Sequence, residues 1–326
     1  MSASGPASLE QVRALIESTA PRLSNWGRWG DDDELGTINY ITESKRQEAA
    51  TLVRSGRVFS LALPFDSQGP QPPFERRLNP QLSMLGTGTD LRLGRQANAP
   101  EGWGYADDMV TMALQCGTQW DALSHVFYGF QMYNGYDCAL VGAEGTAKNG
   151  ISVMRDRMVS RGVLVDIARL HELDALEADH EVTSEDLERA LEVQRTELLS
   201  GDVLLIRTGN LGRFRRVGSW QGYTHSAEPG IGLEALEWLH EREVAALATD
   251  NWAVEVIGYG TNPEAIALPV HAVAIVFMGL TLGENFDLDA LAEDCARDGN
   301  YEFLFCAPPL PFTGAVGSPV NPLAVK

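Results

Sequence analysis

Short apolar runs that alternate with amphipathic helical segments are the feature of this sequence that most constrains its fold. The runs at 162–168, 203–207 and 244–249 have the length and composition of buried strands. Helical patterns separate these runs, and a capping box at 183–186 begins one of the helices. Strands and helices in alternation predict an α/β protein, with a mixed β-sheet core flanked by helices.

The same reasoning assigns the rest of the chain. We find no internal repeat and no compositional break, so we expect one domain over 1–326, with 1–20 as a flexible or helical extension. Residues 66–101 are rich in Pro, Gly, Gln and Asn and are expected to form a long, irregular loop or arm. The other expected elements are strands over 58–63 and 301–306 and helices over 43–55, 232–243, 271–279 and 287–298.

The overall composition argues against several kinds of partner. The chain has 45 acidic and 25 basic residues, a net charge of −20, whereas nucleic acids and anionic membranes require a basic surface. No stretch approaches the roughly 18 apolar residues that a membrane span needs. The first ten residues lack a basic region followed by an apolar one, and the four cysteines are scattered. These features predict a cytoplasmic protein with reduced thiols.

The stretch Gln-Cys-Gly-Thr-Gln-Trp-Asp-Ala-Leu-Ser-His at 115–125 holds the densest group of reactive side chains. Asp121 and His125 are four residues apart, and two amide side chains, Gln115 and Gln119, precede them. A carboxylate, an imidazole and amide oxygens that converge on one point favour a hydrolytic or metal-assisted site. The same spacing is also typical of a polar turn followed by a core strand, and the spacing by itself does not choose between the two.

The motif resembles the Gly-Thr-His-x-Asp-x-x-x-His signature of the cyclase family, which includes bacterial kynurenine formamidase and isatin hydrolase. Further segments are similar to that family, in the same order, over about residues 20 to 310. These segments are 25–30, 32–39, 161–166, 201–209, 249–255, 269–271 and 282–288. The resemblance implies a single cyclase-like domain of the swivelling β/β/α type.

The resemblance also implies a metal site, with two departures from the family pattern. Asp121 keeps a ligand position of the motif, and His271 and Glu284 stand where the family has a second ligand pair. Gln115 and Gln119 stand where members with hydrolase activity have metal-binding histidines. The resulting set is rich in oxygen ligands, which favours Mn²⁺, with Zn²⁺ or Mg²⁺ as alternatives. A site without metal is a further alternative, because an amide oxygen is a weaker donor than an imidazole nitrogen.

From this set we expect a metal-assisted hydrolase that acts on an amide-like bond, or on a cyclic amide or lactone, of a small molecule. A cation-bound water would be the nucleophile and His125 the general base or acid, with Asp121 and Glu284 also catalytic. His271 begins a predicted helix, whose dipole should lower the pKa of its imidazole. The alternatives are a metal-independent cyclase or dehydratase of specialised metabolism that uses His125 and Asp121, and a non-catalytic relative that binds a small molecule.

Aromatic residues near the motif are expected to form an apolar wall of the substrate pocket, although core packing is their other common role. The predicted pocket residues are Trp120, Phe127, Tyr128, His225 and Trp252. The remaining histidines, His171, His180 and His240, are expected at the surface. The resemblance implies a homodimer or homotetramer with pockets near the subunit contacts.

Overall fold

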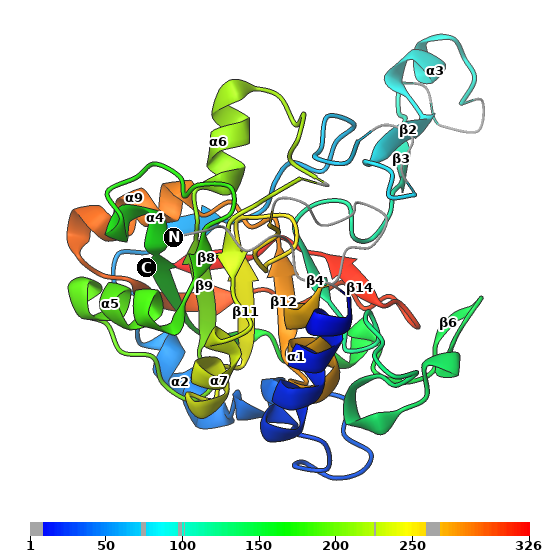
Figure 1. Ribbon diagram of the computed structural model, residues 1–326. Helices are drawn as coiled ribbons and strands as arrows, with labels where there is room; N and C mark the ends of the chain where they lie inside the picture. The colour runs from blue at the N-terminus through cyan, green and yellow to red at the C-terminus, as the bar shows by residue number, and fades with distance from the viewer. Residues whose placement is uncertain (1–8, 73–75, 97–99, 101, 225, 259–267) are drawn as a thin grey trace.

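A mixed β-sheet runs through the middle of the protein and carries the candidate site (Figure 1). The computed structural model describes residues 9–326 except 73–75, 97–99, 101, 225 and 259–267. The sheet contains, among these residues and in spatial order, β1 (Val58–Ser60), β15 (Leu323–Val325), β13 (Glu302–Cys306), β7 (Val159–Asp166), β9 (Val203–Arg207), β11 (Ala246–Thr249), β12 (Thr281–Glu284), β4 (Gln119–Asp121) and β14 (Gly317–Pro319). β7, β9, β11 and β12 are parallel, and the strands outside them pair antiparallel.

Helices flank this sheet (Figure 1). They are α1 (Leu9–Leu23), α2 (Glu43–Ala50), α4 (Ile167–Leu170), α5 (Ser184–Gln194), α6 (Asn210–Val217), α7 (Ala235–Glu241), α8 (Pro269–His271) and α9 (Asp289–Asp298). α2 and α5 pack on β7, and α1 packs on a π-helix, η5 (Ala272–Met278), which continues α8. All residues of β9 are buried, as is typical of a parallel strand that is covered on both faces.

Short elements complete the structure outside the main sheet. The 3₁₀ helices are η1 (Gly36–Tyr40), η2 (Tyr133–Gly135), η3 (Cys138–Leu140) and η4 (Ile151–Met154). Two small ribbons pair β5 (Val141–Gly142) with β6 (Gly145–Thr146), and β8 (Glu181–Val182) with β10 (Gly230–Ile231). β8 and β10 lie close to the loops that follow the parallel strands, because Ile231 bridges to Glu255.

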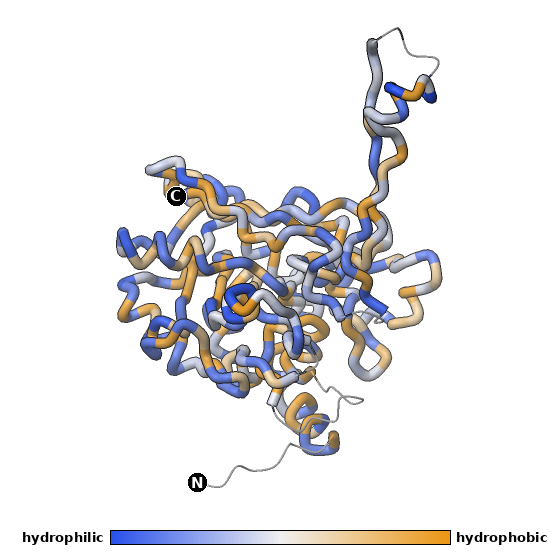
Figure 2. Tube along the Cα trace, turned by 90° about the horizontal axis from the view of Figure 1, so that it is seen from above, coloured by the Kyte–Doolittle hydropathy of each residue, from blue (hydrophilic) through white to orange (hydrophobic). Residues whose placement is uncertain are grey.

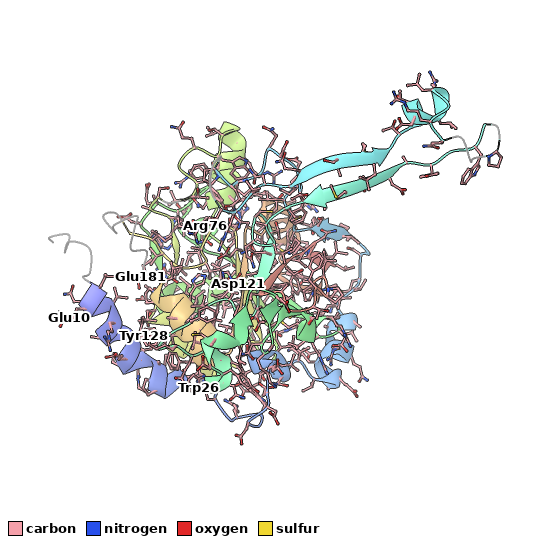
Figure 3. The ribbon with its side chains drawn as sticks, turned by 90° about the vertical axis from the view of Figure 1, so that its right-hand side faces the viewer. Glu10, Trp26, Arg76, Asp121, Tyr128 and Glu181 are labelled. Carbon is pink, nitrogen blue, oxygen red and sulfur yellow. The ribbon has the colours of Figure 1, made fainter. Side chains whose placement is uncertain are left out.

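A hairpin arm projects from the body, as Figure 2 and Figure 3 show most clearly. We use "the arm" for β2 (Gln81–Gly86), α3 (Gly88–Arg92) and β3 (Asp107–Thr111). β2 and β3 pair antiparallel and expose large apolar side chains, including Leu82 at 69%, Leu85 at 66% and Val110 at 51%. The region 66–101, predicted as an irregular loop or arm, therefore contains a strand and a short helix, and its strand pairs with a segment beyond it.

The other expected elements form, with shorter bounds in several places. The strand over 203–207 is confirmed as β9, and the capping box at 183–186 begins α5 as predicted. The helix expected over 43–55 ends at Ala50, and the strand expected over 58–63 ends at Ser60. The apolar helix expected over 271–279 forms as α8 and the π-helix η5. Within the expected extension 1–20, α1 is helical from Leu9 onward, and residues 1–8 lie outside the described residues.

The buried carboxylate of Asp202, directly before β9, joins two basic side chains. Asp202 is fully buried and accepts hydrogen bonds from Nε and Nη2 of Arg161 at 2.9 and 2.6 Å. The Lys45 ammonium lies 2.7 Å from the same carboxylate. This triad connects α2 and β7 to the start of β9, so loss of the Asp202 carboxylate would leave two buried cations without their main partner.

No helix among the described residues combines the length and apolar character needed to cross a bilayer.

Candidate metal centre

The short strand β4, which lies between β12 and the edge strand β14, directs two polar side chains to one face of the sheet. Gln119 and Asp121 are two residues apart, so their side chains point the same way, and both are fully buried. Trp120 points to the opposite face, where its ring contacts Phe286 and Phe305 at centroid distances of 5.2 and 6.2 Å. The prediction that Trp120 lines the substrate pocket is therefore wrong, because strand alternation places it in the apolar core.

Strand β12 brings Glu284 beside this pair. Glu284 is the register partner of Gln119 in the antiparallel β12–β4 ladder. Gly283 makes room for Trp120, since a Cβ at this position would lie 2.6 Å from the indole ring. The Gln119 Nε2 atom donates hydrogen bonds to Glu284 Oε2 at 2.6 Å and to Asp121 Oδ1 at 3.3 Å. One amide therefore bridges two buried carboxylates from neighbouring strands.

His271 completes the cluster from the last residue of α8. Its Nε2 atom lies 3.4 Å from Glu284 Oε1 and 3.9 Å from Asp121 Oδ2. One ligand atom from each of Asp121, His271 and Glu284 lies within 4.8 Å of the other two, and all three residues are buried. The predicted residues of both halves of the chain thus meet at one point.

Glu255 holds His271 from the side away from the carboxylates, a contact that the sequence did not indicate. The His271 Nδ1 atom lies 2.6 Å from Glu255 Oε1, and the same carboxylate accepts the backbone N–H groups of Val270 and His271 at 3.1 and 3.0 Å. Glu255 is 1% exposed. A carboxylate on Nδ1 fixes the ring orientation and leaves Nε2 directed at Asp121 and Glu284.

These contacts reverse the expected pKa of His271. Burial by itself would lower the pKa, but the hydrogen bonds and charges of Glu255 and Glu284 outweigh it and raise the pKa to about 10. The predicted lowering by a helix dipole is wrong, because Glu255 and Glu284 surround the ring and their effect is larger. Burial and the charge of Asp121 raise the pKa of Glu284 to about 7. A bound cation would offset this repulsion between the two carboxylates.

His125 stands next to the cluster. Its Nε2 atom lies 3.8 Å from Asp121 Oδ1, and its side chain is 19% exposed, so it borders the buried group. Burial lowers the pKa of His125 and the charge of Arg77 adds to this effect, although Asp121 opposes it. The imidazole is therefore neutral near pH 7 and able to accept a proton. Arg77 was not among the predicted site residues.

The donor set fits a divalent cation. Asp121 Oδ2 is buried and has no hydrogen-bond partner among the described residues. Buried polar atoms without partners are uncommon, and a cation is one of the groups that satisfies them. Two carboxylates and one imidazole are ligands that Mn²⁺, Mg²⁺ and Zn²⁺ all accept. The three residues can thus hold a divalent metal ion, and the donor set leaves its identity open.

Comparison with known proteins identifies the family. The putative cyclase family model matches residues 59–256. This protein belongs to the putative cyclase family. A crystal structure described as a novel cyclase is 43% identical, with a TM-score of 0.86, and the match covers 93% of this chain and 100% of that chain. Among curated proteins, no sequence matches the chain.

Two isatin hydrolases share the fold at lower identity. Isatin hydrolase A from Ralstonia solanacearum is 20% identical, with a TM-score of 0.58, and the match covers 82% of this chain and 91% of that one. Isatin hydrolase A from Labrenzia aggregata, solved with benzyl benzoate bound, is 19% identical, with a TM-score of 0.58 and coverage of 85% and 96%. The predicted family and the cyclase-like α/β fold are confirmed.

The contacts of Gln115 and Gln119 differ from the oxygen ligation that the sequence predicts for both residues. Gln119 directs its amide nitrogen, not its oxygen, at Glu284 and Asp121. Gln115 is half-buried and its Nε2 atom packs against Gly317 of β14, where a Cβ would come within 2.5 Å of it. No hydrogen bond of the described residues joins Gln115 to the cluster, and its Nε2 atom has no partner there.

The predicted pocket residues lie in different surroundings. Phe127 and Tyr128 line a cavity of about 670 Å³, together with part of α1 and the residues Leu268 and Ala272. Ala272 follows His271 directly, so this cavity borders the segment that carries the imidazole. His225 lies outside the described residues.

Trp252 lies on the side of the site that carries Glu284. It packs on a cluster of Leu63, Leu211 and Tyr223. The Tyr223 hydroxyl donates a hydrogen bond to Asn285 Oδ1 at 2.7 Å, and Asn285 follows Glu284 in the chain. The assignment of Phe127, Tyr128 and Trp252 to the substrate pocket stays a prediction.

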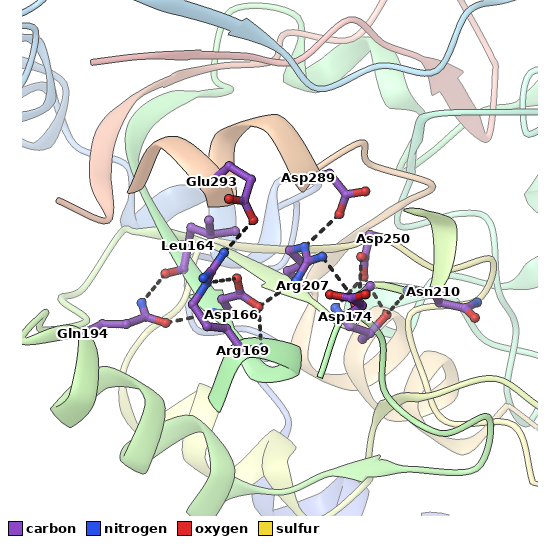
Figure 4. Close-up of polar contacts among 12 residues, drawn as sticks. Leu164, Asp166, Arg169, Asp174, Gln194, Arg207, Asn210, Asp250, Asp289 and Glu293 are labelled. Atoms are coloured by element: carbon purple, nitrogen blue, oxygen red, sulfur yellow. Dashed lines mark hydrogen bonds and ion pairs between the residues drawn. The ribbon is translucent and has the colours of Figure 1, made fainter. Parts of the chain in front are cut away.

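Ion pairs occupy the ends of the neighbouring parallel strands (Figure 4). Arg207 at the end of β9 pairs with Asp166 at the end of β7 at 3.0 Å and with Asp289 of α9 at 2.9 Å. Asp250, directly after β11, accepts the backbone N–H groups of Thr208 and Gly209 at 2.7 Å each. The polar residues at these strand ends bind loops and α9, whereas the reactive groups lie on β4 and β12.

Proposed function

We propose that this protein is a metal-assisted hydrolase of a small molecule with an amide-like bond, a cyclic amide or a lactone. The observation that carries the proposal is the convergence of Asp121, His271 and Glu284, with the His125 imidazole 3.8 Å from Asp121. The shared fold with two isatin hydrolases supports it. Two of the three ligands are carboxylates, so Mn²⁺ is the favoured ion.

The residues of the site have separate tasks in this mechanism. Asp121, His271 and Glu284 would hold the ion, which when bound polarises a carbonyl and acidifies a water, worth several kcal/mol in the transition state. His125 accepts a proton from the attacking water and returns it to the leaving nitrogen or oxygen, which is worth about 10²- to 10⁴-fold in rate. Glu255 keeps His271 oriented through Nδ1. Gln119 donates to both carboxylates and fixes their separation.

Two variants and a substrate panel test this proposal. We expect the purified enzyme to contain one equivalent of metal at this site and to hydrolyse at least one member of a panel of formamides, cyclic imides and lactones. Asp121→Ala should lose both this metal and turnover, whereas His125→Ala should keep the metal and lose turnover. His240→Ala is the control, since His240 lies outside the cluster. Full activity in His125→Ala would refute its role as the acid or base.

One observation favours a second candidate, a metal-independent cyclase or dehydratase. The Gln119 amide nitrogen already donates to one oxygen of each carboxylate, which reduces the need for a cation between them. In this version His125 and Asp121 would transfer the proton, without a metal ion. Turnover that survives exhaustive chelation would favour this candidate, and turnover that is lost and then restored by Mn²⁺ would favour the hydrolase.

We also infer that the protein assembles as a homodimer or homotetramer through the arm. Among the described residues, β2 and β3 form a two-stranded sheet separate from the main sheet, and they expose apolar side chains. An exposed hairpin with such side chains is a common contact surface between subunits. The mass of the particle in solution, measured by light scattering, tests this assembly.

A further inference from the structure

A second group of metal-ligating side chains forms away from Asp121, His271 and Glu284. His171 follows α4, His180 precedes β8, and Asp186 lies in the first turn of α5. Although the sequence places both histidines at the surface as unrelated residues, one ligand atom from each of the three lies within 4.8 Å of the other two. The two imidazole rings meet edge to face with centroids 4.9 Å apart.

The geometry of this group is close to that of a zinc site. His171 Nε2 lies 3.1 Å from Asp186 Oδ1, and His180 Nε2 lies 3.9 Å from Asp186 Oδ2. Ligands of tetrahedral zinc at about 2.0–2.2 Å from the ion are about 3.3 Å from one another. The His171–Asp186 distance is already close to this spacing, and His180 Nε2 has to approach Asp186 to reach it. The His180 side chain is 26% exposed, so the ring has room to turn.

The pairing of His171 with Asp186 does not account for the position of His180. Its Nε2 atom is buried and has no hydrogen-bond partner within the part of the chain that the structure describes, whereas His171 Nε2 already has Asp186. Asp186 also accepts the Thr183 N–H and hydroxyl groups in the capping box of α5, at 3.1 and 2.9 Å. The carboxylate is thus held in place by its own helix, and a ring nitrogen beside it lacks a partner.

We propose that His171, His180 and Asp186 bind a structural zinc ion. Two imidazole nitrogens and one carboxylate form a donor set that zinc accepts, with the fourth position open to water. The ion would join the end of α4, the start of β8 and the first turn of α5. The backbone of His180 also accepts the Gly230 N–H at 3.2 Å, so the same ion would strengthen the contact between β8 and β10.

Zinc titration of variants tests this site independently of the proposed function. Protein purified without a polyhistidine tag is stripped of metal and titrated with ZnCl₂ against a chromophoric chelator. The titration is done in a His271→Ala background, which removes the first cluster. We expect one bound zinc in this background and none when His180→Ala is added. His240→Ala in the same background is the control and should keep the ion.

Thermal unfolding gives a second readout. At a hundredfold excess of free zinc over Kd, Tm in the His271→Ala background should rise by roughly 4 °C, and by less than about 1 °C after His180→Ala is added. Asp186→Asn, which retains an oxygen for the helix cap, should also lose the ion. Equal zinc binding with and without His180 would overturn the proposal. If the wild-type protein and His271→Ala both bind one ion, the first metal centre fails while this one stands, and no bound ion in His271→Ala would overturn this one.

Discussion

Replacing Glu255 by glutamine separates two tasks of this buried carboxylate. In the wild-type protein Oε1 accepts His271 Nδ1 and the His271 N–H, while Oε2 accepts the Val270 N–H. Glutamine has the same shape but only one oxygen acceptor. The least costly arrangement keeps that oxygen on His271 and turns the NH₂ group toward the Val270 N–H, so that two donors face each other.

The expected changes in stability and in metal affinity follow from these contacts. One buried N–H loses its acceptor, which costs about 1–3 kcal/mol. The acceptor of the His271 bond changes from a carboxylate to a neutral amide oxygen, which weakens the bond and adds about 1 kcal/mol. We therefore expect the free energy of unfolding to fall by about 2–4 kcal/mol. Weaker orientation and lower basicity of His271 should reduce metal affinity about 10- to 100-fold.

Two measurements on the same protein check this expectation. Urea unfolding of the metal-free protein gives the change in stability, and competition with a chelator gives the metal affinity. Glu228→Gln is the matched control, because Glu228 is also buried and accepts two backbone N–H groups, those of Trp252 and Ala253, without contacting His271. If Glu255→Gln is destabilised but binds metal with wild-type affinity, Glu255 only supports the backbone and the reasoning is wrong.

Three further predictions concern regions away from the centre. Asp202→Asn leaves Arg161 and Lys45 buried without their carboxylate, so urea titration should show a loss of about 3–5 kcal/mol. Burial by itself would raise the pKa of Asp298, but hydrogen bonds from basic side chains outweigh burial and lower this pKa. The stabilisation that Asp298 contributes is therefore present above about pH 4 and is lost as the pH falls further. Asp298→Asn should therefore reduce stability at pH 7, by less than about 1 kcal/mol, and have no effect near pH 2. Leu85→Lys on the arm should reduce the particle mass seen by light scattering, and an unchanged oligomer would exclude the arm as the contact.

Some parts of the structure were predictable from local sequence because local physics determines them. The strand at 203–207 and the capping box of α5 depend on neighbouring residues, and both form as predicted. The arm strands were missed because both faces are solvated, so their residues lack the alternation that burial imposes. The position of Trp120 was available from the sequence, since a strand that directs Gln119 and Asp121 to one face must direct the residue between them to the other.

The sequence determined which residue types were available for the candidate centre and, through the order of its motifs, the family and fold. Only the tertiary structure decided the surroundings of these residues. The pKa of His271 is raised because Glu255, from the loop after β11, and Glu284, at the end of β12, both approach the ring. Gln119 faces the carboxylates with its nitrogen because β12 pairs with β4. Such effects depend on distances of a few ångströms between groups that are far apart along the chain, which no local pattern encodes.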